Sequence, residues 1–234
     1  GARSQGIEMA VIALKEEASL ELEKVAKRVH WVSLGELSKT IDLMHQEGVT
    51  QAVMAGQVKH NKIFSSIRPD WKLAKLLFSL PRKNTDSLIG AVARVLEEEG
   101  IRLVDSTLFL KPLLPEAGVL TRRAPNAHEA EDMAYGRGLA QQIAAMDIGQ
   151  TVVIADRACV AVEAMEGTDE AIARAGRLAG AGTRVVKVAK PTQDMRFDVP
   201  VVGRQTSDAM CAAGASALSV DAGRTLFVDG DEIV

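Results

Sequence analysis

"GQTVVIADRACVAVEAMEGTDE" (149–170) contains two apolar runs, TVVIA and ACVAVEA, separated by only Asp156 and Arg157. Parallel strands need a connection of a dozen or more residues, whereas antiparallel strands can be joined by two. The stretch therefore predicts a tight β-hairpin. A hairpin interrupts any purely parallel sheet, so this part of the chain is expected to form a mixed α/β domain.

The residues before this hairpin alternate between two other patterns. Strand-like runs are predicted at 7–14, 28–34, 49–56 and 101–105, and helical spacing at 34–48, 71–80 and 86–100. Strands that alternate with helices indicate a parallel, Rossmann-like sheet covered by helices on both faces. The opening "GARSQG" resembles the tail of a helix ended by Gly6, so we expect the first strand of this domain to be missing.

The segment "KPLLPEAGVLTRRAPN" (111–126) is the best candidate for a domain boundary, because three prolines and a polar end interrupt both patterns. We predict a Rossmann-like N-terminal domain over 1–125 and a mixed α/β C-terminal domain over 126–234. Beyond the hairpin, the C-terminal domain is expected to contain helices at 127–146, 169–180 and 206–213. Its further strands are expected in TRVVKVA, VPVVG, ALSVDAG and TLFVDG.

Composition excludes some classes of function. The chain has 28 basic and 31 acidic residues and a net charge of −3, so no nucleic-acid partner is expected. Its apolar runs are far shorter than a membrane-spanning helix requires. Cys159 and Cys211 lie in apolar contexts and are predicted to be buried free thiols, which fits a cytoplasmic protein.

The stretch "KVAKPTQDMRFDVPVVG" (187–203) carries unusually many charges between two prolines. Lys190 and Arg196 offer cations, and Asp194 and Asp198 offer carboxylates. This mixture suits a phosphate held by Lys and Arg beside a divalent cation held by Asp. The alternative is a solvated loop with local ion pairs, which would add little stability. Asp198 precedes a predicted strand, where a carboxylate is costly unless it is paired or used.

The sequence EGTD (166–169) forms a predicted strand-to-helix turn. Gly167 would let the backbone approach a ligand closely, and the N–H groups at the helix start could hold phosphate. In the alternative interpretation, Thr168 or Asp169 caps the helix and the acids complement its dipole. Glu163 lies in a strand that should be buried, so it needs a partner.

In the first half, "MAGQVKHNKIF" follows the end of a predicted strand. Ligands of parallel α/β sheets bind beyond the carboxyl ends of the strands. Gln57 and Lys59 fall in that position and are candidate ligand contacts. Four histidines are scattered along the chain, with no spacing typical of a metal site.

Two long segments together carry a resemblance to a known family. "DIGQTVVIADRACVAVEAMEGTDEAI" and "VVKVAKPTQDMRFDVPVVGRQT" closely resemble the LpxI-type UDP-2,3-diacylglucosamine diphosphatases of lipid A biosynthesis. The family pattern has GQ before the hairpin, EA-x-EGTD at the turn, and K-x-x-QD-x-R-x-D-x-P-x-x-G in the charged loop. "VMAGQVK", "DSLIGAV" and "LEEEGIRLVDSTLFLKPLLPEAGVLT" are similar to the first half of the family, so the resemblance covers nearly the whole chain.

The resemblance implies an enzyme that hydrolyses the diphosphate of UDP-2,3-diacylglucosamine to UMP and 2,3-diacylglucosamine 1-phosphate (lipid X). It implies dependence on a divalent cation, usually Mg²⁺, with Asp198 as the key catalytic residue. Arg196 and Lys190 would hold phosphoryl oxygens, and Asp198, Asp169 and Glu166 would hold the metal. The expected substrate-binding residues are Gln150, Gly167, Thr168, Gln193, Asp194, Gly203 and Thr206, together with Gln57 and Lys59.

The alternative function is a nucleotide-sugar or phosphate-binding module without catalysis. The resemblance also leaves room for a homodimer and for transient contact with the inner membrane surface by a cytoplasmic protein.

Overall fold

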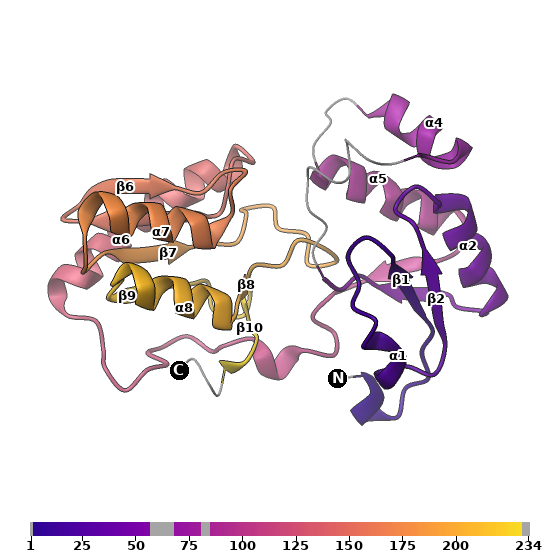
Figure 1. The fold of residues 1–234 in the computed structure, drawn as a ribbon, viewed down its shortest axis with the longest axis horizontal. Helices are drawn as coiled ribbons and strands as arrows, with labels where there is room; N and C mark the ends of the chain where they lie inside the picture. The colour runs from indigo at the N-terminus through magenta and orange to yellow at the C-terminus, as the bar shows by residue number, and fades with distance from the viewer. Residues whose placement is uncertain (1, 57–67, 81–84, 231–234) are drawn as a thin grey trace. The chain divides into compact units, whose positions relative to one another are not determined.

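The fold is taken from a computed structural model that describes residues 2–56, 68–80 and 85–230 (Figure 1). The chain forms two compact units. The first comprises 1–109 with 196–198, and the second comprises 110–195 with 199–234. Both units contain helices and β-strands, which confirms the predicted two-domain α/β architecture. The boundary at residue 125 stays a prediction.

The first unit contains two parallel strand pairs with helices between them. Its elements are η1 (Ala2–Gln5), β1 (Val11–Leu14), α1 (Leu22–Val25), β2 (Val29–Val32), α2 (Leu37–Gln46), β3 (Gln51–Val53), α4 (Trp71–Ser79), α5 (Thr85–Glu98) and β4 (Arg102–Val104). β1 pairs with β2 and β3 with β4, both in parallel. The sequence pattern predicted these strands and the longer helices, but not the single turn of α1.

Helices α2, α4 and α5 pack around one aliphatic core in this unit. The buried members are Leu37, Ile41, Leu73, Leu76, Leu88, Ala91, Leu96 and Ile101. Asp70 caps α4, since its carboxylate accepts a hydrogen bond from the Leu73 N–H at 2.9 Å. The same carboxylate accepts from the Ser38 N–H at 2.6 Å and so ties α4 to α2.

The second unit is a mixed sheet with helices on both faces. Its elements are η2 (Lys111–Leu113), α6 (Ala127–Ala145), β5 (Thr151–Ala155), β6 (Ala158–Val162), α7 (Thr168–Ala179), β7 (Arg184–Lys187), β8 (Val201–Val202), α8 (Arg204–Ala213), β9 (Ala217–Ser219) and β10 (Leu226–Phe227). The main sheet has the order β6-β5-β7-β9, and β8 and β10 form a separate parallel pair. β5 is antiparallel to β6 and β7, whereas β7 and β9 are parallel, as expected for a mixed domain.

The side chains of β5 and β7 are apolar on both faces of the sheet, which explains why helices cover both faces. Val152, Ile154 and Val186 pack with α6, whereas Val153 and Val185 pack with α7. Figure 1 shows α6 on one side of the sheet and α7 and α8 on the other. All five side chains are fully buried, because successive side chains of a strand point to opposite faces.

The hairpin between β5 and β6 is anchored by a buried acid on α6. Asp156 and Arg157 have φ of 50° and 58°, the conformation that a two-residue hairpin turn requires. The Asp132 carboxylate accepts hydrogen bonds from both of their N–H groups, at 3.1 and 2.7 Å. This anchoring explains how the turn forms without glycine.

The predicted burial of the two cysteines was wrong. Cys159 and Cys211 are both exposed free thiols. Cys159 lies on β6, which is the edge strand of its sheet, and Cys211 lies on α8. On β6 the buried position is that of Ala161, and on α8 the half-buried Met210 and Ala213 pack against the core instead of Cys211. Over the part of the chain that the structure describes, no helix is long and apolar enough to cross a membrane.

Candidate functional site

A polar cluster lies where β7 ends and α7 begins. Lys187 is the last residue of β7 and Thr168 the first of α7, and the Lys187 Nζ donates to the Thr168 Oγ1 at 2.6 Å. The Thr168 hydroxyl donates to the Glu163 Oε1 at 2.8 Å. Thr151, opposite Lys187 in the sheet, has its Oγ1 3.4 Å from that of Thr168. The EGTD turn therefore meets the sheet through hydroxyl groups.

The GQ pair joins this cluster from the start of β5. The Gln150 N–H donates to the Glu163 Oε2 at 3.2 Å. A Cβ on Gly149 would lie 2.1 Å from the Glu163 carbonyl oxygen, so only glycine allows the two backbones to approach this closely. The partners of the Glu163 carboxylate are thus a hydroxyl and a backbone N–H. The prediction that Glu163 lies within a buried strand was wrong, because β6 ends at Val162 and Glu163 is half-buried.

The EGTD turn does not cap its own helix in the way that the alternative interpretation expected. The residue at the N-cap position of α7 is Gly167, with φ of 87° and no side-chain hydrogen bond. Thr168 and Asp169 already lie within the helix. The N-cap residue of α7 therefore provides no side-chain cap for its first N–H groups. The other part of that interpretation is confirmed, since Asp169 and Glu170 lie in the first turn, where acids complement the helix dipole.

Two of the predicted residues join the starts of α7 and α8. The Thr206 Oγ1 donates to the Asp169 Oδ1 at 2.8 Å, and Thr206 is buried. Gly203 occupies the N-cap position of α8 without a side-chain cap. The helices α7 and α8 also pack against each other near their C-terminal ends, through Gly176 and Ala213. The bond between Thr206 and Asp169 joins their N-terminal turns.

Glu166 makes contacts that differ from those of Asp169. The Arg174 guanidinium contacts its Oε1 at 2.6 Å, and the Ala164 N–H donates to its Oε2 at 3.2 Å. Both Glu166 oxygens are therefore engaged, whereas in the described structure Asp169 has a contact on one oxygen, from Thr206. Asp169 is better placed than Glu166 to offer an oxygen to a cation.

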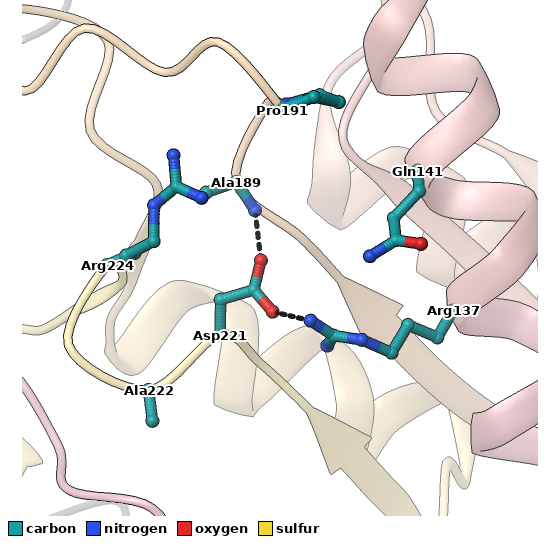
Figure 2. A pocket seen from close by; sticks show the side chains of 7 residues that line it. All are labelled: Arg137, Gln141, Ala189, Pro191, Asp221, Ala222 and Arg224. Atoms are coloured by element: carbon teal, nitrogen blue, oxygen red, sulfur yellow. Dashed lines mark hydrogen bonds and ion pairs between the residues drawn. The ribbon is translucent and has the colours of Figure 1, made fainter.

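The loop that follows β7 is held by the C-terminal end of the unit. The Asp221 carboxylate accepts from the Ala189 N–H at 2.9 Å and contacts the Arg137 guanidinium at 2.5 Å. The Arg224 guanidinium donates to the Lys190 carbonyl at 3.1 Å. Figure 2 shows these side chains around a pocket of about 510 Å³, which Gln141, Pro191 and Ala222 also line.

Within this loop, Lys190 and Gln193 have ordered contacts. The Lys190 Nζ contacts the Asp147 Oδ1 at 2.7 Å, and its side chain is 15% exposed. The Gln193 side-chain oxygen accepts from the Lys190 N–H at 3.0 Å. Lys190 is thus a paired cation, and it would have to exchange Asp147 for a phosphate to act as predicted.

Arg196 and Asp198 belong to the short piece of the loop that groups with the first unit. The Arg196 carbonyl accepts from the Ser106 Oγ at 2.6 Å, and its guanidinium lies 5.9 Å from the Phe197 ring centre. Asp198 is exposed and has a φ of 58°, a conformation that few residues other than glycine adopt. Such backbone outliers concentrate at functional sites.

Two predicted contacts, Gln57 and Lys59, lie outside the described residues. Asp194 is half-buried. Lys187 was not among the site residues predicted from the sequence. Its contact with Thr168 follows from the pairing of β5 with β7, which the sequence pattern alone does not specify. A lysine at the end of an otherwise apolar run was the available signal.

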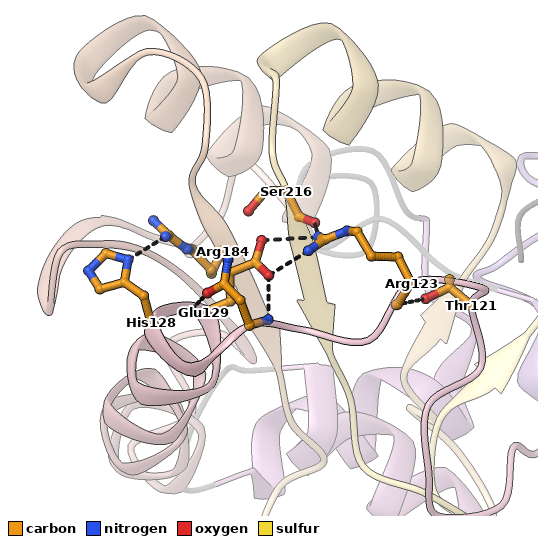
Figure 3. A network of polar contacts seen from close by, with 7 residues as sticks. Thr121, Arg123, His128, Glu129, Arg184 and Ser216 are labelled. Atoms are coloured by element: carbon orange, nitrogen blue, oxygen red, sulfur yellow. Dashed lines mark hydrogen bonds and ion pairs between the residues drawn. The ribbon is translucent and has the colours of Figure 1, made fainter.

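Among the described side chains, the one grouping with the separations of a metal site is His128, Asp132 and Asp156. The Arg184 guanidinium lies 3.2 Å from the Asp132 Oδ2. It also lies 2.7 Å from the His128 Nδ1 (Figure 3). The guanidinium thus supplies the positive charge that the buried Asp132 needs. We interpret this group as the anchor of the hairpin, and the sequence signal was an aspartate on the small-residue face of α6.

Comparison with known proteins identifies the family of the chain. The family model for the LpxI N-terminal domain matches residues 1–113, and that for the LpxI C-terminal domain matches residues 116–234. A relative from Caulobacter vibrioides, "UDP-2,3-diacylglucosamine pyrophosphatase LpxI", is 30% identical over 214 residues. That alignment covers 87% of this chain and 76% of the relative.

Proposed function

The chain belongs to the LpxI family, and from this premise we propose that it hydrolyses the diphosphate of UDP-2,3-diacylglucosamine. The observation that supports this function is the polar cluster at the starts of α7 and α8. Gln150, Thr168 and Thr206, three of the residues expected from the family motifs, meet there with Asp169. Packing alone does not call for so many polar groups in one place.

The proposed reaction needs one water molecule. Water adds to one phosphorus of the diphosphate as the bond from that phosphorus to the bridging oxygen breaks. UMP and 2,3-diacylglucosamine 1-phosphate are formed, and a proton is released. A phosphoryl group with this much negative charge requires neutralisation and an oriented nucleophile.

The donor set fits a hard divalent cation such as Mg²⁺, which prefers carboxylate oxygens. In our proposal Asp198, Asp169 and Glu166 hold the ion. Asp169 is supported best, since one of its oxygens carries no contact in the described structure. When bound, the ion would neutralise phosphoryl charge and lower the pKa of a bound water.

The cationic side chains of the charged loop would hold the substrate. Arg196 provides a planar fork that matches two phosphoryl oxygens. Lys190 would contribute a second cation after leaving Asp147, and the ordered Asp221 and Arg224 contacts keep its backbone in place. Gln193, Asp194 and Gly203 remain proposed substrate contacts on the same stretch, as do Gln57 and Lys59 in the first half.

We also propose that the protein works in the cytoplasm, with transient contact at the inner membrane surface where its acylated substrate resides. A homodimer is part of this proposal. Analytical ultracentrifugation would test the dimer, and co-sedimentation with vesicles that contain the substrate would test the contact.

The decisive experiment incubates the protein with UDP-2,3-diacylglucosamine, in Mg²⁺ and in excess EDTA, and follows UMP by chromatography. The proposal predicts UMP together with an equal amount of 2,3-diacylglucosamine 1-phosphate in Mg²⁺, and little of either in EDTA. Binding of the substrate without release of UMP would instead support the non-catalytic nucleotide-sugar or phosphate-binding module. Release that is equal in EDTA would contradict the metal site alone.

A further inference from the structure

Lys187 is a buried cation that has one hydrogen-bond partner in the described structure. The residue is 8% exposed, and its Nζ donates to the Thr168 Oγ1 at 2.6 Å. In the described part of the chain, no carboxylate forms an ion pair with this ammonium. A buried ammonium group with one neutral acceptor is unfavourable, so the fold keeps this charge at a cost to its own stability.

The nearby carboxylates are engaged by hydroxyl groups rather than by this cation. The Glu163 carboxylate accepts from Thr168, and the Asp169 carboxylate accepts from Thr206. An ammonium group has three N–H donors, and one of the three is used in the described structure. Lys187 therefore retains hydrogen-bonding capacity for a further acceptor.

The surroundings of Lys187 favour a negatively charged acceptor. Thr168, its hydrogen-bond partner, is the first residue of α7, whose N-cap residue Gly167 provides no side-chain hydrogen bond. The N-terminal turn of α8 is joined to that of α7 through Thr206 and Asp169. Two helix N-termini add partial positive charge to the ammonium.

We propose that Lys187 is a substrate-binding residue whose ammonium binds a non-bridging phosphoryl oxygen of the ligand. The identity of that ligand as a nucleotide diphosphate rests on the proposed function, whereas the anion site rests on Lys187 and its surroundings. Lys187 differs from Lys190, which lies on a loop and is already paired with Asp147. Because β7 and the Thr168 hydroxyl hold Lys187 in place, little ordering is needed when the anion binds.

The test measures binding of UMP and of inorganic phosphate by isothermal titration calorimetry, in the presence of Mg²⁺. Lys187→Met removes the charge and the donors but keeps an unbranched stem that fits a buried site. Lys187→Gln removes the charge but keeps an N–H donor for Thr168. Arg177→Met is the matched control, since Arg177 is an exposed cation of α7 outside the cluster.

Both Lys187 variants are expected to bind UMP and phosphate about 10- to 100-fold more weakly, because one charge-assisted hydrogen bond is lost. Arg177→Met should bind within twofold of the original protein. Affinities within twofold for a folded Lys187→Met or Lys187→Gln would overturn the inference, even if the protein hydrolyses its substrate. Conversely, a Lys187-dependent affinity without release of UMP would keep the anion site and reject the proposed reaction.

Discussion

Two buried charges of the second unit, Glu129 and Lys187, have opposite surroundings. Glu129 is 3% exposed, and Arg123 contacts both of its oxygens, at 2.7 and 3.0 Å (Figure 3). The Asn126 N–H donates to the same carboxylate at 2.9 Å. Lys187 is similarly buried, but its contact is one hydroxyl group.

The consequence for Glu129 is a lowered pKa. Hydrogen bonds from Arg123 and from the Asn126 backbone lower the pKa of Glu129 from 4.5 to about 2, against the opposing effect of burial. Arg123 also donates to the Ser216 carbonyl at 2.6 Å, so one network joins the segment before α6, the start of α6 and the approach to β9. A buried charge with this many partners serves the fold.

The comparison teaches how structural charges can be told from functional ones. A structural charge has partners for its hydrogen-bonding groups, as Glu129 does. A charge that binds a ligand has fewer hydrogen-bond partners within the protein, as Lys187 does, because the ligand supplies the remaining acceptors. Replacing the first should change stability, and replacing the second should change activity.

The largest effect is expected for Asp198→Ala, at the exposed left-handed position of the charged loop. If Asp198 holds the cation and the phosphoryl group, kcat should fall at least about 10³-fold while the substrate still binds. Release of UMP measured under saturating substrate checks this prediction. Turnover within threefold of the original protein would exclude Asp198 from the chemistry.

A smaller effect is expected for Glu129→Gln. Loss of the charge-assisted bonds to Arg123 should lower the free energy of unfolding of the second unit by about 1.5–3 kcal/mol. Activity per folded molecule should not change, because Glu129 lies in the structural network. Urea denaturation followed by circular dichroism gives the stability, and the UMP assay on the folded protein gives the activity.

Arg196→Lys should have an effect near 1.4 kcal/mol, that is, about tenfold in kcat/KM. Lysine keeps the charge but loses the planar fork that binds two oxygens at once. The kinetics of UMP release check this value. An unchanged kcat/KM would show that Arg196 supplies charge alone or lies outside the site.

The last prediction concerns the pH dependence of the Glu129→Gln effect. Because the pKa of Glu129 is lowered in the folded protein, its ionised form stabilises the fold above the unfolded value of 4.5. That contribution is lost as the pH falls from about 4.5 to about 2. Denaturation at pH 7, 4 and 2 should therefore show the original protein and Glu129→Gln converging at the lowest pH. A difference that stays constant would contradict the assigned ionisation.

Much of the fold could be predicted from the sequence because local patterns determine it. The hairpin followed from two apolar runs around Asp156 and Arg157, and its antiparallel pairing is confirmed. The helices of both units followed from apolar spacing and from glycines that end them, such as Gly48 and Gly100. The short α1 has too few residues to show such a pattern.

Long-range contacts of the site could not be predicted in this way. Lys187 meets Thr168 because β7 lies beside β5 in the sheet order, which local spacing does not reveal. Cys159 was expected to be buried, but β6 is an edge strand. The alternative interpretation of the EGTD turn placed the cap of α7 on Thr168 or Asp169, whereas Gly167 occupies that position. Each error arose where tertiary structure decides between two locally acceptable states.

One measurement tests the central contrast most directly. Lys187→Met and Glu129→Gln are prepared side by side, and each is assayed for melting temperature and for UMP release per folded molecule. Lys187→Met is expected to melt at or above the temperature of the original protein and to lose at least tenfold in kcat/KM. Glu129→Gln is expected to melt several degrees lower, because each kcal/mol of lost stability lowers the melting temperature by about 2–4 °C, and to keep its activity. A Lys187→Met protein that is less stable but fully active per folded molecule would contradict this contrast.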